Sequence, residues 1–131
     1  ATWTAEETTD GLTLANGVST VRLSASDLLP ADATACVEAV AADLALTPSR
    51  QGYEVLRGED GTPASGGNAE AAFAIHGFTG ATGDIRFEQI VCVSLPAGRG
   101  TILLLHTGPL EAVGKELEAV QILLAGLSVA R

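Results

Sequence analysis

The first clear pattern in the chain is an alternation of apolar and polar residues on either side of Asn16-Gly17. Alternation is typical of strands with one buried face, and Asn-Gly favours the positive-φ positions of a two-residue type I′ turn. We therefore predict a β-hairpin, with a bulge near Ser19-Thr20 and a short strand carrying Trp3 before it. The alternating apolar positions are Leu12, Leu14, Val18, Val21 and Leu23.

The next segment has helical periodicity. It begins near Pro30 or Asp32 and ends before Pro48, and its apolar residues recur at steps of three and four. This spacing predicts one amphipathic helix whose buried face includes Cys36. The residues on that face are Ala33, Cys36, Val37, Val40, Ala41 and Leu44.

A short strand is predicted at residues 53–57, followed by a stretch rich in Gly, Ser and Pro at 58–68. A surface loop and a binding loop are both compatible with that composition. The stretch does not end in Gly-Lys-Ser/Thr and does not lead into a helix, so it is not a phosphate loop.

Three strands are predicted next, at residues 70–78, 84–95 and 100–107, joined by short turn-rich links that favour antiparallel hairpins. The runs "IVCV" and "ILLLH" are apolar at consecutive positions, which indicates that both faces of the sheet are covered. A final helix is predicted after Pro109, because apolar residues recur with helical spacing from Leu110 to Leu127.

These elements together predict a single α+β domain over residues 1–131, an antiparallel sheet covered by helices on both faces in an α/β/α sandwich. With 47% apolar and 18% charged residues the chain can bury a core. Its net charge of −9 disfavours nucleic acids and anionic membrane surfaces as partners. We find no apolar run long enough to cross a membrane. Because methionine is absent, we interpret the chain as the mature or trimmed part of a longer protein.

The chain resembles the PsbP/Mog-like group in its hairpin "GLTLANGVSTVRLSA", its following helix, the segment "GYEVL…GGNAEAAF", and the closing "GTILLLHTGPLEAVGKELEAVQILLAGLSV". The group's usual Tyr-Pro-x-x-Trp opening is not present. The resemblance implies an exported, often lipid-anchored bacterial domain, in a group that is mostly non-enzymatic. Other members of the group assist photosystem II or bind a nuclear GTPase. No functional residue carries over, because the shared features are patterns of hydrophobicity.

The two histidines, His76 and His106, are the candidate polar groups of a pocket. If Phe78 pairs near Ile85 and Leu95 near Thr101, the histidines lie on opposite faces of the sheet. His106 then shares a face with Cys92. No third zinc ligand is near, and a Cys-His nucleophile pair is disfavoured by the buried strand around Cys92. We predict no metal, no cofactor and no catalytic residue.

Asp84, Arg86 and Glu88 lie at the start of one predicted strand. Arg86 and Glu88 are two residues apart and share a face, so we interpret them as a solvated surface pair. A paired-carboxylate acid-base site would need a second acid across a cleft, and the sequence identifies none.

The two cysteines admit three interpretations: a disulfide, two buried free thiols, or a metal site. A helix axis packs about 10 Å above a sheet, so Cys36 on the helix and Cys92 on the strand can come within bonding distance. An exported protein favours pairing, so we rank a Cys36–Cys92 disulfide first.

Three functions remain open from the sequence. The first is a non-catalytic extracytoplasmic binding or accessory domain for a protein or small-molecule partner, tethered through an upstream segment. The second is a small ligand-binding or enzymatic domain whose pocket between sheet and helix uses His76 or His106. The third is an extracellular sensor module of a membrane receptor or kinase.

Overall fold

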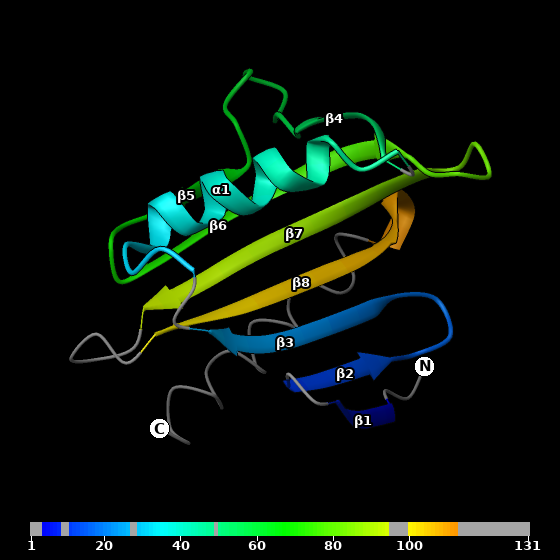
Figure 1. Ribbon diagram of the computed structural model, residues 1–131. Helices are drawn as coiled ribbons and strands as arrows, with labels where there is room; N and C mark the ends of the chain where they lie inside the picture. Colours follow the sequence, from blue (N-terminus) through cyan, green and yellow to red (C-terminus); the bar gives the residue numbers. More distant parts are fainter. Residues whose placement is uncertain (1–3, 9–10, 27–28, 49, 95–99, 113–131) are drawn as a thin grey trace.

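The computed structural model describes residues 4–8, 11–26, 29–48, 50–94 and 100–112 (Figure 1). These residues form one antiparallel sheet with a single α-helix, α1, and a short 3-10 helix at the end of the last strand. The elements are β1 Thr4–Thr8, β2 Gly11–Ala15, β3 Thr20–Ser26, α1 Ala33–Ala45, β4 Gln51–Val55, β5 Ser65–Gly67, β6 Ala71–Thr79, β7 Ile85–Ser94, β8 Thr101–Pro109 and η2 Leu110–Ala112.

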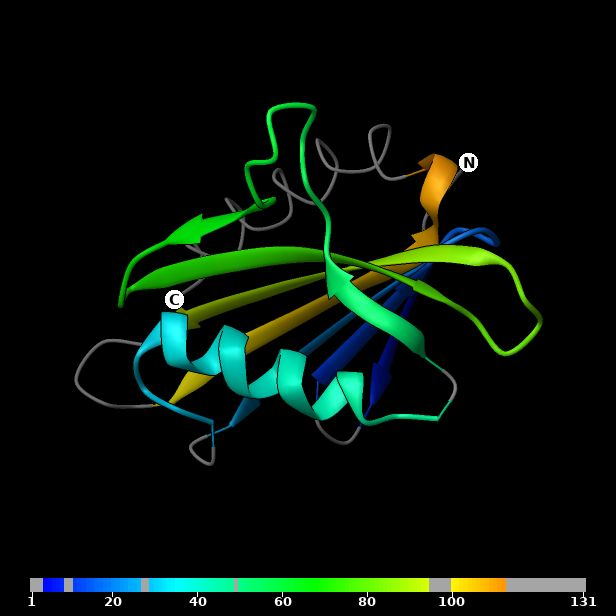
Figure 2. The ribbon, with the colours of Figure 1, turned by 90° about the horizontal axis from the view of Figure 1, so that it is seen from above.

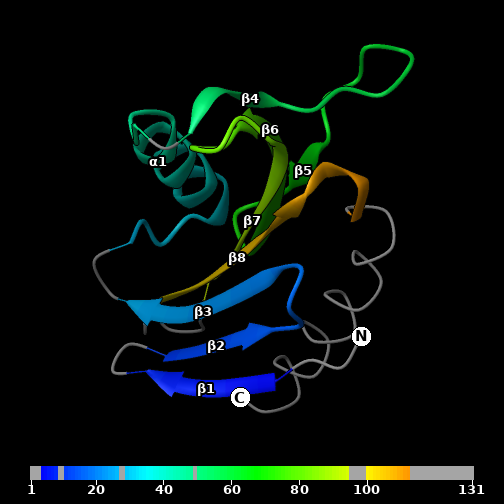
Figure 3. The ribbon, with the colours of Figure 1, turned by 90° about the vertical axis from the view of Figure 1, so that its right-hand side faces the viewer.

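The strands follow the order β1-β2-β3-β8-β7-β6-β4, and β5 also pairs with β6. Consequently β4 and β5 lie end to end along the same edge of β6, with residues 56–64 between them. The helix α1 lies on one face of the sheet, over β6 and β7 (Figures 1 and 3). Within the described residues no helix is long and apolar enough to cross a membrane.

The prediction of a sandwich with helices on both faces is wrong, because the described part of the chain contains eight strands and one α-helix on one face. The predicted final helix falls mostly in residues 113–131, outside the described residues. The prediction from the apolar runs that both faces of the sheet are buried is confirmed, because each face has its own apolar cluster. Apolar residues on both faces of a strand show that both faces are buried, but they do not show which element covers each face. The inference of a second layer of helices therefore failed.

Two apolar clusters use the two faces of the long central strands. On the α1 face, Ile90 and Cys92 pack with the helix, and on the other face Val91 and Val93 pack with side chains of β2, β3 and β8. The predicted helix face is confirmed in full by the first cluster. The helix begins after Asp32, whose side chain accepts a hydrogen bond from the Ala35 amide at 3.1 Å.

The first hairpin is confirmed, but its turn differs from the prediction. Ala15 pairs with Thr20, so the loop has four residues instead of two, and the register between β2 and β3 is unbroken. The Asn16 side chain accepts hydrogen bonds from the amides of Val18 and Ser19, at 2.9 and 2.7 Å. This longer loop absorbs the break in alternation for which we had predicted a bulge. A strand precedes the hairpin as predicted, although Trp3 lies outside the described residues.

The three central strands are also confirmed, each pairing one residue away from the expected register. Thr79 pairs with Ile85, and Ser94 pairs with Thr101. Because successive side chains point to opposite faces, a shift of one residue moves a side chain to the other face. His76 and His106 therefore lie on opposite faces as predicted, but each lies on the face that we predicted for the other.

The predicted disulfide between Cys36 and Cys92 is present. Their Cα atoms are 6.2 Å apart, and both residues are fully buried between α1 and the sheet. The bond joins residues 56 apart in the sequence and therefore restricts a long loop of the unfolded chain.

We expect the oxidised protein to show no free thiol when it is denatured without a reductant. Replacing both cysteines by alanine should lower the free energy of unfolding by about 4 kcal/mol, because the unfolded chain regains the entropy of the open loop. Urea unfolding of the oxidised protein and of the variant measures this difference. Two titratable thiols in the untreated, denatured protein would contradict the assignment.

Candidate functional site

A groove with a volume of about 410 Å³ lies on the α1 face, between the helix and the edge of the sheet. Its helical wall consists of Thr34, Val37, Glu38 and Ala41, which lie at steps of three and four on one side of α1. In Figure 2, seen from above, the ribbon of β6 runs between α1 and β5. The volume falls in the range of small-molecule sites.

The floor of the groove is built from β6. Alternate residues of this strand share the face toward the helix, namely Ala72, Ala74 and His76. The floor therefore consists of two alanine methyl groups followed by one imidazole. The small alanine side chains leave the space that the groove occupies. His76 is the polar group of this floor.

The wall opposite the helix is formed by β5 and the end of β4. At Gly67 the backbone has φ of 112°, and a Cβ there would clash with the carbonyl oxygen of Ala71. Only glycine suits that position. Gly66 and Gly67 both line the groove, so much of this wall is main chain. Val55 adds an apolar side chain beside His76, its partner in the β4–β6 pairing.

His76 is 9% exposed, and its Nδ1 atom is buried without a hydrogen-bond partner among the described residues. Its ring stacks on Tyr53, with the centroids 4.6 Å apart and the planes within 10° of parallel. Burial lowers the pKa of His76, and the negative charge of Glu88 opposes this effect only in part. The imidazole is therefore neutral at pH 7, with one nitrogen that donates and one that accepts.

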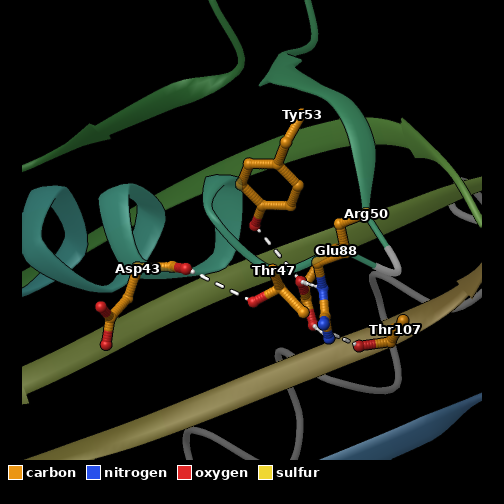
Figure 4. Close-up of polar contacts among 6 residues, drawn as sticks. All are labelled: Asp43, Thr47, Arg50, Tyr53, Glu88 and Thr107. Carbon is orange, nitrogen blue, oxygen red and sulfur yellow. Dashed lines mark hydrogen bonds and ion pairs between the residues drawn. The ribbon is translucent and has the colours of Figure 1, made fainter.

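Tyr53 is held in turn by a buried carboxylate (Figure 4). Its hydroxyl donates to Glu88 Oε1 at 3.3 Å, and Thr107 donates to Glu88 Oε2 at 2.7 Å. Arg50 donates to both oxygens, from Nε at 2.8 Å and from an NH2 group at 3.0 Å. The pKa of the Tyr53 hydroxyl is raised, first by burial and then by the adjacent Glu88 charge.

Glu88 is only 1% exposed, so its charge is stable there because it accepts four hydrogen bonds, two of them from a guanidinium. The cluster joins β4 and the residue before it to β7 and β8. With both oxygens occupied, the carboxylate has no free position for general-base chemistry. Its role is to position Tyr53, and through Tyr53 the ring of His76.

The prediction that Arg86 and Glu88 form a surface pair is wrong. Arg86 forms an ion pair with Asp84 at 3.0 Å, and both side chains are partly exposed. Glu88 is buried on the face of the sheet that α1 covers. One signal in the sequence could have revealed this. Glu88 alternates with Ile90 and Cys92, and the inferred disulfide already placed Cys92 beneath the helix.

His106, the other candidate pocket residue, does not line the groove. It is fully buried on the face opposite α1, with Nδ1 3.4 Å from Gln89 Oε1 and its ring edge-on to Phe87. Adjacent positions of β7 pair with His76 and His106, so the predicted placement on opposite faces is confirmed. The expectation that His106 shares a face with Cys92 is wrong, because Cys92 lies on the α1 face.

No group of three His, Cys, Asp or Glu side chains in the described ranges could hold a metal ion. Comparison of the chain with protein-family models, with curated proteins and with solved structures finds no match in any of the three. The PsbP/Mog-like assignment therefore stays a prediction, and the argument for function rests on the groove.

The buried ion pair and the exposed one provide a matched test of stability. Replacing Arg50 by alanine should lower the free energy of unfolding by about 3 kcal/mol, because it leaves Glu88 charged and buried. Replacing Arg86 by alanine should cost at most about 1 kcal/mol, because its pair with Asp84 is partly solvated. Denaturant unfolding of both variants measures the two changes in the free energy of unfolding. Equal decreases for the two variants would contradict a structural role for the Glu88 cluster.

The lowered pKa of His76 predicts how stability depends on pH. Near pH 6.5 the unfolded chain takes up a proton on this histidine before the folded chain does. Stability should therefore fall as the pH drops below 6.5, with a contribution of at most about 1.4 kcal/mol per pH unit. Replacing His76 by phenylalanine should remove that contribution. Urea unfolding between pH 5 and 8 measures it, and identical slopes for the two proteins would refute it.

Proposed function

We propose that this domain binds a small ligand in the groove between α1 and β5, with His76 as its central polar contact. The observation that carries the proposal is the open groove lined by the imidazole of His76, which makes no hydrogen bond to any described residue. A groove that combines apolar side chains with a few polar groups is the usual form of such a site.

The proposal is for binding without catalysis. A hydrolytic or acid-base site would need a second reactive group within hydrogen-bond reach of the imidazole. The neighbouring carboxylate, Glu88, is fully engaged by Arg50, Tyr53 and Thr107. His76 is thus placed to donate or accept one hydrogen bond, which suits recognition.

We further propose that the domain works in an extracytoplasmic compartment. The Cys36–Cys92 disulfide supports this, because such bonds persist where the environment is oxidising. The resemblance to exported PsbP/Mog-like domains points the same way. A tether upstream of this segment, a sensor role within a receptor and a role as an accessory factor would all be compatible with a ligand-binding domain.

Ligand binding can be tested by screening fragments against the ¹⁵N-labelled protein by NMR. We expect hits whose chemical-shift changes centre on Ala72, Ala74 and His76. Replacing Glu38 by tryptophan places a bulky ring at the groove wall and should abolish those shifts. Replacing Ala39 by tryptophan, one position further on the exposed side of α1, should leave them unchanged. Shifts scattered over the sheet, or insensitive to the residue-38 variant, would refute the site.

A further inference from the structure

We propose that the groove selects an uncharged, mainly apolar molecule carrying one hydroxyl or amide group, which forms its hydrogen bond with His76. This inference rests on the proposed function and names the class of ligand. Three features of the groove support it: the fixed imidazole of His76, the apolar side chains of the floor and sides, and the balance of charge at the rim.

The imidazole of His76 is held in one position. Its Nδ1 atom is fully buried, which leaves Nε2 as the ring nitrogen that a ligand in the groove can contact, and the ring lies flat against Tyr53. Tyr53 is itself held by Glu88, so the ring cannot turn easily to find another partner. A hydroxyl or amide group can both donate and accept, and it therefore matches either tautomer of the neutral imidazole. An immobile partner of this kind also reduces the entropy lost on binding.

The remainder of the groove favours an apolar body. The methyl groups of Ala72 and Ala74 cover the floor, and Val37 and Val55 contribute to the two sides. Placing apolar surface here gains about 25 cal/mol for each Å² removed from water. Because the floor residues are small, a flat ring can lie over them with its polar substituent directed along β6 toward His76.

The charges at the rim do not favour an ionic ligand of either sign. Among the described residues that line the groove, Glu38 and Arg57 are the charged ones, and they carry opposite charges. Arg57 already donates a hydrogen bond to the carbonyl oxygen of Gly61 at 3.0 Å. An anion would also approach a chain of net charge −9. Burying an ion without a paired charge is costly, so a neutral ligand is favoured.

Three probes of similar size separate the contributions: p-cresol, toluene and benzoate. We expect p-cresol to bind about tenfold more tightly than toluene, because it alone of these two completes the hydrogen bond to His76. Benzoate should bind more weakly than p-cresol. Affinities come from NMR titration of the oxidised protein at pH 7.5, followed through the amides of β6 and the Cε1–H signal of His76.

The matched variant is His76→Phe, which keeps an aromatic ring against Tyr53 and removes both nitrogens. It should abolish the preference for p-cresol over toluene while toluene still binds. Should this variant fail to fold, as judged by circular dichroism, the Glu38→Trp variant replaces it. That variant should lose p-cresol binding, whereas Ala39→Trp should retain it.

The outcomes distinguish this inference from the proposed function. If benzoate binds most tightly and Glu38→Trp abolishes its binding, the groove is a binding site but the ligand class is wrong. Equal affinities for p-cresol and toluene would overturn the role of His76 in the same way. If these probes and the fragment screen alike leave the groove unperturbed, the inference and the proposed function both fail.

Discussion

The groove and its histidine depend on the buried carboxylate of Glu88. The carboxylate can remain buried because Arg50, Tyr53 and Thr107 complete its hydrogen bonds, and these donors come from both sides of β7. One interaction thus joins the edge of the sheet to its centre. It also fixes Tyr53, whose ring supports the imidazole of His76. A buried ion pair contributes little net stability compared with apolar packing, so its main effect here is to specify one arrangement of the edge.

The other wall of the groove depends on the position of α1. The helix is held over β6 and β7 by its apolar face and by the Cys36–Cys92 bond. Cys92 pairs across the strands with Ala72, which forms part of the groove floor. The disulfide therefore lies close to the site and keeps the helical wall at a constant distance from the floor. The edge cluster and the disulfide together make the groove a preformed feature of the fold, as expected of a ligand site.

The sequence was most informative where a local pattern had a single structural solution. The helix at 33–45, the first hairpin and the three central strands all follow from period, caps and turns. The register was less certain, because the β6–β7 and β7–β8 pairings each differed by one residue from the expectation. That small difference placed His76, and not His106, on the face beneath α1. The site could therefore be narrowed to two histidines from the sequence, and no further.

Glu88 shows the limit of the same method. Glu88 lies two residues from Arg86 on one strand, so the sequence suggested that the two form a surface pair. Its hydrogen-bond partners Arg50, Tyr53 and Thr107 instead lie 38, 35 and 19 residues away in the chain. Likewise, the apolar runs of β7 and β8 indicated protected faces without identifying what protects them.

The sequence by itself determined the helix at 33–45, the first hairpin, the three central strands and the apolar face of the helix, since these depend on local period and turn residues. It ranked the Cys36–Cys92 disulfide first among three interpretations, and the fold brought the two cysteines together. Tertiary structure alone decided which histidine meets a groove and which carboxylate is buried. Those outcomes depend on register and on contacts between distant segments, because a shift of one residue reverses the face on which a side chain lies.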